Sequence, residues 1–262
     1  MNNREPIITL TTDFGGRDGY VGIVRGIILA LNPDARLVDI AHDLPPFNIE
    51  TAAYLLKNCH GAFPPGTVHL AVVDPGVGTD RAPVLIETRS YYLIGPDNGL
   101  FGFLSPREIR RVIVLNSGKY FSRDISRTFH ARDIFAPAAG YLSLGIDPTE
   151  LGPARNKINR EVIVRPRRTS RGLVGRVVYV DRFGNLASSI TEKNIPQLPV
   201  TVYVNGVRVG RLRKTFGSVK PGRPVAYINS FGHLEIAVNR GSAAEYFGLT
   251  VSSGAEILIA SD

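Results

Sequence analysis

The pattern of apolar residues changes once along this chain, and that change constrains the fold more than any other feature. Over roughly the first 150 residues, short apolar runs typical of buried strands alternate with stretches whose apolar residues recur at helical spacing. Such alternation predicts a mostly parallel sheet covered on both faces. After residue 172, short segments with period-two alternation follow one another, separated by turn residues. We therefore expect an α/β N-terminal domain followed by an all-β C-terminal barrel.

The same pattern predicts the individual elements and the domain limits. In the first half we expect strands at 6–13, 37–40, 69–74 and 111–115, a hairpin of 84–88 with 91–94, and helices at 19–31, 48–59 and 133–144. In the second half we expect strands at 173–179, 200–204, 207–212, 225–228, 234–238 and 256–260. Asn205-Gly206, between two of these strands, is typical of a hairpin turn. The predicted organisation is a domain at 1–155, a basic linker at 156–171 and a domain at 172–262.

Composition excludes several classes of protein. The longest apolar runs fall short of the ~18 residues that a membrane span needs, and the N-terminal residues do not resemble a signal peptide, so we expect a cytoplasmic protein without membrane contact. Cys59 is the only cysteine, which rules out an intrachain disulfide and makes structural zinc unexpected. Its apolar surroundings in the sequence favour a buried small residue over a nucleophile.

The net charge of +8 raises the possibility of nucleic-acid binding. The basic residues concentrate at 155–171, but aromatic residues are not interleaved there and no nucleic-acid-binding motif accompanies them. We therefore interpret this stretch as a solvated linker and expect no nucleic-acid partner. A nucleic-acid-binding module remains the alternative from a different functional class.

Two predicted strands end in an acid. Asp13 closes the first strand, and Asp74 lies in the segment VVDPGVGTDR, where glycines let the backbone approach a ligand closely. Because parallel strands end at one edge of a sheet, both acids could meet at one crevice. A carboxylate there can bind a ribose diol, although Asp13 could equally cap the helix near Gly19. The chain contains neither G-x-G-x-x-G nor a Walker loop, so no pyrophosphate cofactor is indicated.

Polar residues at two further places could carry chemistry. His130 precedes a predicted helix, whose dipole would favour the neutral imidazole. Taken by itself, this histidine is interpreted as a core or capping residue, and a role in holding a water molecule is the alternative. In the turn at 181–185, Phe183 could stack on a purine, Asn185 could bind the edge of the base and Asp181 could take an ammonium group. From the residues alone, a plain Gly-Asn turn is the favoured interpretation of that segment. Similar polar turns lie at 230–232 and 239–242.

Taken together, these segments resemble the S-adenosyl-L-methionine hydrolases, also called S-adenosyl-L-methionine hydroxide adenosyltransferases, whose relatives include fluorinases and chlorinases. The matching motifs are ITLTTDFG, VVDPGVGTDR, GPDNGLF, TFHARDIFAPAAG, DRFGN and FGHLEIAVNRGSAA, and they cover nearly the whole chain. The resemblance implies a homotrimer. It also implies a site between the N-terminal domain of one subunit and the C-terminal domain of the next.

The resemblance further implies that water or hydroxide attacks C5′ of the substrate ribose, releasing adenosine and L-methionine. It assigns Asp74, Arg81 and His130 to the nucleophile, and no metal or redox cofactor is implied. The residues that it assigns to substrate binding are Asp13 for the ribose, Asp181 and Ser230 for the methionine, and Phe183, Asn185, Asn239, Arg240 and Ala243 for the adenine.

Within the family, hydrolase and halogenase must be distinguished. Fluorinases resemble TFYS where this chain reads Thr128-Phe129-His130-Ala131. Histidine thus replaces a tyrosine, and Ala131 offers no hydroxyl to a halide. The region 92–111 is compact and lacks the fluorinase-specific insertion. Hydroxide is the expected nucleophile; a chlorinase-like halogenase and a non-catalytic binder of S-adenosylmethionine or adenosine remain alternatives.

Overall fold

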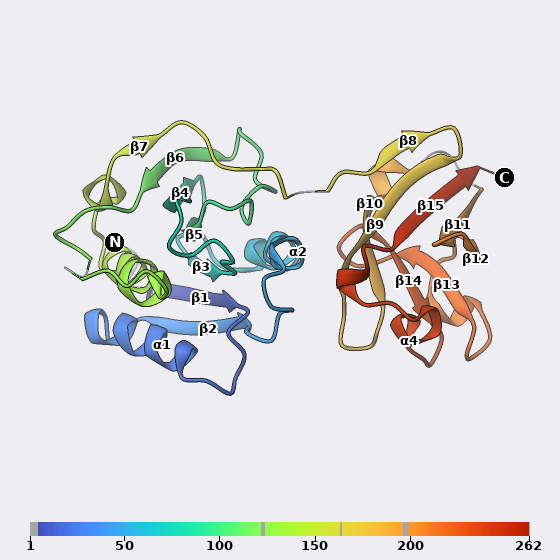
Figure 1. The fold of residues 1–262 in the computed structure, drawn as a ribbon, viewed down its shortest axis with the longest axis horizontal. Helices are drawn as coiled ribbons and strands as arrows, with labels where there is room; N and C mark the ends of the chain where they lie inside the picture. Colours follow the sequence, from blue (N-terminus) through green and yellow to red (C-terminus); the bar gives the residue numbers. More distant parts are fainter. Residues whose placement is uncertain (1–4, 122–123, 163, 196–198, 262) are drawn as a thin grey trace. The chain divides into compact units, whose positions relative to one another are not determined.

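The structure, a computed structural model, describes residues 5–121, 124–162, 164–195 and 199–261. The chain divides into two compact units, Met1–Ile163 and Val164–Asp262 (Figure 1). The first unit contains strands and helices, and the second contains mostly strands.

The first unit is built on a seven-stranded mixed sheet with the order β2-β1-β3-β5-β4-β6-β7. The strands are β1 (Ile7–Thr12), β2 (Arg36–Ala41), β3 (Val68–Val72), β4 (Pro83–Thr88), β5 (Tyr92–Pro96), β6 (Ile109–Val114) and β7 (Ala154–Arg155). Pairings among β2, β1, β3 and β5 are parallel, whereas β4 pairs antiparallel with both β5 and β6, and β6 pairs antiparallel with β7.

The expectation of a mostly parallel sheet is therefore only partly right. Three of the six pairings are antiparallel. The predicted hairpin is confirmed, and it is the cause of the difference, because a short turn can join only antiparallel strands. The hairpin places β4 outside β5, so the connection from β3 to β4 passes over the end of β5.

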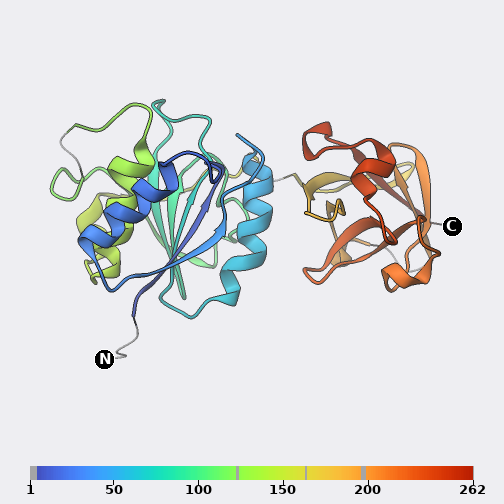
Figure 2. The ribbon, with the colours of Figure 1, turned by 90° about the horizontal axis from the view of Figure 1, so that it is seen from below.

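Helices cover both faces of this sheet (Figure 2). On one face, α1 (Tyr20–Leu31) and α3 (Ala136–Ser143) pack over a core that includes Ile8 and Leu70. On the other, α2 (Ile49–Cys59) packs through Ala52, Ala53 and Leu56. The side chain of Asn48 caps α2 by accepting a hydrogen bond from Thr51 N. Helices begin and end close to the predicted limits.

The predicted helix at 133–144 begins differently in the structure. A π-helical turn, Ala131–Phe135, leads into α3, and Ala136 N donates to Ala131 O five residues back. Pro137 has no N–H to donate to Asp133 O and its ring would crowd that carbonyl, so a wider turn is favoured ahead of it. This turn places His130 at the start of the helical segment.

The second unit is a nearly closed antiparallel sheet with the order β12-β11-β15-β9-β10-β14-β13, in which β8 also pairs with β9. The strands are β8 (Arg167–Thr169), β9 (Gly172–Val180), β10 (Leu186–Thr191), β11 (Val200–Val204), β12 (Val207–Arg211), β13 (Pro224–Ile228), β14 (His233–Val238) and β15 (Glu256–Ser261). A bridge between Leu212 and Ala226 links the two ends of the order. The predicted barrel-like architecture is confirmed.

The Asn205-Gly206 hairpin is also confirmed: both residues have positive φ, 46° and 80°, as a type I′ turn requires. β10 and α4 (Ala243–Phe247) were not predicted. β10 reads LASSIT, and its two buried serines hide the apolar alternation that normally signals a strand. Among the described residues, no helix is long and apolar enough to cross a membrane.

Candidate active site

The carboxyl ends of β1 and β3 meet at one edge of the first sheet, since these strands pair in parallel with Thr12 opposite Val72. Asp13 and Asp74 follow these ends, and both line a cavity of about 550 Å³. The sequence-based expectation that the two acids share a crevice is confirmed. Asp13 does not cap α1, whose N-cap is Gly19.

Asp74 and Arg81 are joined by two hydrogen bonds. Arg81 donates from Nε to Asp74 Oδ1 at 3.1 Å and from Nη2 to Oδ2 at 2.5 Å. The side chains are only 8% and 6% exposed, for Arg81 and Asp74 respectively, so water screens the pair weakly. The chain returns to this spot because residues 73–82 cross the end of β5 and enter β4 at the same sheet edge as Asp74.

His130 completes this cluster. Its Nδ1 lies 2.7 Å from Arg81 Nη2. A guanidinium can only donate, so Nδ1 accepts and a neutral imidazole carries its hydrogen on Nε2. Burial and then the charge of Arg81 lower the pKa of His130 below 6.5, while Asp74 and Asp133 oppose the shift. The neutral form expected from the sequence is thus favoured, but mainly by burial and Arg81 rather than by a helix dipole.

Arg81 retains one unused donor. Within the described residues its Nη1 is buried and has no hydrogen-bond partner. A buried donor without a partner is costly, so such a group is normally satisfied by water or by a ligand. Arg81 does not itself line the cavity, but the same guanidinium contacts Asp74 and His130, which do, so a small polar molecule bound beside them can satisfy this donor.

Close packing of the backbone fixes the loop that carries Asp74. Gly78 has a φ of +79°, and a side chain there would collide with the carbonyl oxygen of Arg127, close to His130 in the sequence. Asn98, in the motif GPDNGLF, donates from Nδ2 to Val73 O at 2.8 Å. The motif GPDNGLF indicates a functional segment, but the motif alone does not reveal this role of Asn98.

Asp13 is held by a second set of contacts. Its Oδ2 accepts from Phe47 N at 2.8 Å. Phe47 has a φ of +64° and is 71% exposed, which is unusual for a bulky residue, and it lines the same cavity. Behind this loop, the Thr12 hydroxyl lies 2.8 Å from His42 Nδ1, and Gly15 N donates to His42 O.

Three aromatic rings add an apolar wall to the cavity. Phe14, Tyr20 and Phe129 contact one another at centroid distances of 5.2 to 6.3 Å. Neither this wall nor Phe47 was predicted from the sequence, because the rings come from separate segments whose meeting depends on the tertiary fold. The cavity therefore combines an apolar wall, two acids and a neutral histidine, a composition typical of small-molecule sites.

The other predicted residues belong to the second unit. Asp181 accepts from Phe183 N, Asn185 N and Asn185 Nδ2 at 2.8 to 2.9 Å, so its carboxylate orders its own turn. Phe183 is 76% exposed. Gly184, with a φ of +79°, packs directly on Ser242. Gly184 O also accepts from Ala244 N, which brings the 181–185 turn against the 239–243 segment.

Not all predicted binding residues of this unit gather there. Asn239 donates from Nδ2 to Val219 O, Arg240 is exposed with a φ of +56°, and Ala243 is fully buried in the barrel core. Ser230 is exposed at the opposite end of β14 from Asn239. The structure thus brings together two groups of predicted residues, one in each unit, and leaves Ser230 apart from the second group.

Comparisons with known families define the class of protein. Residues 8–152 match the N-terminal domain of the SAM hydroxide adenosyltransferases and residues 175–256 match their C-terminal domain, and the chain belongs to this family. Relatives named (R)-S-adenosyl-L-methionine hydrolase occur in Thermus thermophilus, at 42% identity over 91% of this chain and 94% of the relative, and in Salinispora tropica, at 36% over 94% and 95%.

Fluorinases are more distant relatives: one from Nocardia brasiliensis is 26% identical over 98% of both chains. Among solved structures, an uncharacterised conserved protein from Thermotoga maritima superposes with a TM-score of 0.87 at 32% identity, over 97% of this chain and 99% of that one. A conserved hypothetical protein from Thermus thermophilus gives 0.78 at 39%, with the same coverage.

Proposed function

We propose that this chain is an enzyme that hydrolyses S-adenosyl-L-methionine to adenosine and L-methionine. The observation that carries the proposal is the contact of the Asp74–Arg81 ion pair with a neutral His130 beside the cavity. Relatives at 36–42% identity that are named for hydrolysis of the (R) form support the same activity. We extend that preference for the (R) configuration at sulfur to this chain.

The reaction is a substitution at C5′ of the ribose. The oxygen of a water molecule forms a bond to C5′ while the C5′–S bond breaks, and the electron pair of that bond remains on sulfur. Methionine leaves as a neutral thioether, and the attacking water gives up a proton. A sulfonium is already a good leaving group, so the protein mainly has to orient and desolvate the nucleophile.

The hydrogen-bond pattern favours one assignment of roles. Arg81 Nη1 is the unused donor that can hold the water oxygen, and its fixed charge stabilises hydroxide character. His130 Nδ1 already accepts from Arg81, which makes Nε2–H a second donor. Asp74 uses one lone pair on each oxygen for Arg81 and retains others. We therefore assign proton acceptance to Asp74 and orientation of the water to Arg81 and His130.

Substrate binding completes the proposal. One Asp13 oxygen bonds to Phe47 N, which leaves lone pairs for the two ribose hydroxyls. Exposed Phe183 with Asn185, and the segment 239–243, supply the adenine contacts, and Asp181 supplies one to methionine. Ser230, beyond the start of β14, keeps its assignment to methionine from the family resemblance alone. We propose a homotrimer in which these C-terminal residues complete the cavity of a neighbouring subunit. Neither metal nor redox cofactor enters this chemistry.

Water is preferred over halide as the nucleophile. Ala131 is 3% exposed and has no hydroxyl with which to hold a halide ion. The fluorinases are also the more distant relatives, at 26–27% identity.

Incubation with the separated (R) and (S) epimers at sulfur, followed by chromatography, tests the proposal. We expect adenosine and L-methionine in equal amounts and faster turnover of the (R) epimer. With chloride added, formation of 5′-chloroadenosine in place of adenosine would instead identify a halogenase. Binding of the substrate without any product would identify a non-catalytic binder.

A further inference from the structure

The first unit contains a second cavity, of about 520 Å³, whose charged lining is entirely cationic. It lies where the start of β6 meets the chain that follows β7. Five basic side chains and no acid line it: Arg110, Arg111, Arg155, Lys157 and Arg160. An all-cationic lining in a concave surface concentrates positive potential and favours an anionic ligand.

Two of these side chains are held in place by ion pairs with buried carboxylates. Arg111 Nε donates to Glu87 at 2.5 Å, and the Glu87 carboxylate is 10% exposed. Arg155 Nη1 lies 3.0 Å from Asp97, whose side chain is 3% exposed. Such anchoring reduces the conformational entropy that the arginines lose when a ligand binds.

Two cations of this cavity have no carboxylate partner in the described parts of the chain. Arg160 donates from Nη1 to the carbonyl oxygens of Gly102 and Leu104, which orients its guanidinium without neutralising it. Lys157 forms no ion pair with a described carboxylate. Three carboxylates, those of Glu87, Asp97 and Asp147, contact the other cations, so the local balance is 5 − 3 = +2.

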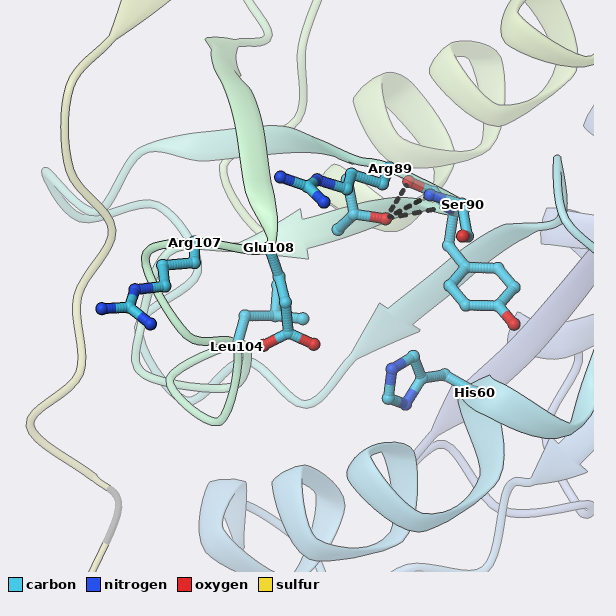
Figure 3. A pocket seen from close by; sticks show the side chains of 8 residues that line it. His60, Arg89, Ser90, Leu104, Arg107 and Glu108 are labelled. Carbon is cyan, nitrogen blue, oxygen red and sulfur yellow. Dashed lines mark hydrogen bonds between the residues drawn. The ribbon is translucent and has the colours of Figure 1, made fainter.

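The acid nearest in sequence faces a different cavity. Figure 3 shows the neighbouring pocket of about 350 Å³, into which Glu108 points its carboxylate toward His60 and Leu104. Glu108 accepts there from Ser105 N at 2.7 Å. These hydrogen bonds to Ser105 lower the pKa of Glu108, and the charge of Arg160 adds to the shift. Glu108 is thus fixed outside the cationic cavity.

The floor of the cationic cavity is apolar. Ile109, Val112 and Ile158 line it together with Pro106, and Val112 and Ile158 are buried. A cationic rim over an apolar floor fits an organic anion better than a bare ion. We propose that this cavity binds a phosphate monoester of nucleotide size. Such a group carries a charge of about −1.5 to −2 at neutral pH, which matches the local balance.

This site is distinct from the hydrolytic cavity. The two cavities share no lining residue. β6 runs in the same direction as β1 and β3, so its first residues lie at the sheet edge opposite Asp13 and Asp74. β6 is also three places from β3 and four places from β1 in the strand order. Binding at this site can therefore be measured separately from hydrolysis.

Calorimetric titration with uridine 5′-monophosphate tests the proposal, with adenosine and L-methionine present in excess to fill the hydrolytic site. We expect binding that weakens several-fold when salt rises from about 50 to 300 mM, because a partly exposed charged site is screened. Lys157→Gln and Arg110→Gln should each weaken it at least about fivefold. Lys119→Gln and Arg36→Gln, at similarly exposed cations outside the cavity, should leave it unchanged.

Each alternative result overturns the proposal in a definite way. Equal affinity for inorganic phosphate and the nucleotide would show that the apolar floor makes no contact. Tight binding of a single-stranded oligonucleotide without binding of the mononucleotide would identify a nucleic-acid surface. Absence of both, or unchanged binding in Lys157→Gln and Arg110→Gln, would remove the site. Hydrolysis by these variants should equal that of the unaltered protein, so failure here leaves the proposed hydrolase untouched.

Discussion

At the scale of single residues, the proposed chemistry depends on one guanidinium that contacts two partners. Arg81 reaches Asp74 with two nitrogens and His130 with one of the same two, which only a planar fork allows. A lysine at this position could place its single nitrogen near one partner at most. The consequence is that charge alone is insufficient at position 81.

We therefore expect Arg81→Lys to lower kcat by about 10²–10³-fold, the usual cost of losing a preorganised donor, with KM changed far less. His130→Asn, which removes the imidazole, should give a loss of similar size. Steady-state kinetics with the (R) epimer measures both. Arg36→Lys, on the exposed surface, is the matched control. A rate near that of the unaltered protein in Arg81→Lys would refute the role of the fork.

The pH dependence follows from the lowered pKa of His130. The active form is neutral and exists above that pKa, so kcat/KM should remain level from neutral pH downward and fall only below 6.5. His130→Asn should lack this acidic limb. A limb centred above 6.5, or one that persists in the variant, would show that another group controls the rate.

At this scale the sequence was sufficient to predict which residues form the candidate site, but not how their side chains and backbone are arranged. Motif positions led to Asp74, Arg81 and His130, and the structure places them in contact. The tautomer of His130 could not be predicted from the sequence, because it depends on which ring nitrogen faces Arg81. The positive φ of Phe47 could not be predicted from the sequence either, since it is imposed by the fold around Asp13.

At the scale of elements, the loop between β3 and β4 is held by packing of its backbone. Gly78→Ala would combine a positive φ with a collision against Arg127 O. We expect a loss of at least about 1–2 kcal/mol in the free energy of unfolding, from backbone strain alone, together with reduced turnover. Denaturant unfolding and kinetics measure the two effects.

Gly76→Ala is the matched control in the same loop. A Cβ there would meet only ordinary contacts, with Thr79 Oγ1 at 3.4 Å and Arg81 Cγ at 3.5 Å. Its stability should stay close to that of the unaltered protein. If Gly78→Ala were equally stable, the close approach to Arg127 would have no structural importance.

Elements were predicted where local patterns decide them and missed where tertiary context does. The 205–206 turn and the β4–β5 hairpin followed from local chemistry. The π-helical turn before Pro137 did not, because apolar spacing alone is similar for either helix type. The mixed sheet was implicit in the hairpin, yet alternation of strands and helices suggested a mostly parallel one.

At the scale of the whole molecule, the proposed substrate contacts are divided between two units. Phe183 is the residue that best tests this division. Its large ring is 76% exposed, so it contributes little to the stability of its own barrel and is free to contact the substrate. Phe183→Ala should therefore change the free energy of unfolding by less than about 0.5 kcal/mol. It should raise KM several-fold with a smaller effect on kcat, since the ring contacts the bound base in both ground and transition states.

Kinetics and thermal unfolding of Phe183→Ala test this division. Val207→Ala, another exposed apolar side chain of the barrel, serves as the control and should leave both KM and stability unchanged. A strongly destabilised Phe183→Ala protein would mean that the ring has a structural role. An unchanged KM would place adenine elsewhere.

The passage of residues 73–82 over β5 limits how the length of this chain can vary. The segment spans two interstrand spacings, about 10 Å, and delivers Arg81 back to Asp74. One inserted or deleted residue would shift the arrival of Arg81 by about 3.3 Å, more than a hydrogen bond tolerates. Laboratory evolution can thus exchange side chains within residues 73–82. Mutant libraries that lengthen or shorten this segment should instead yield folded proteins without turnover.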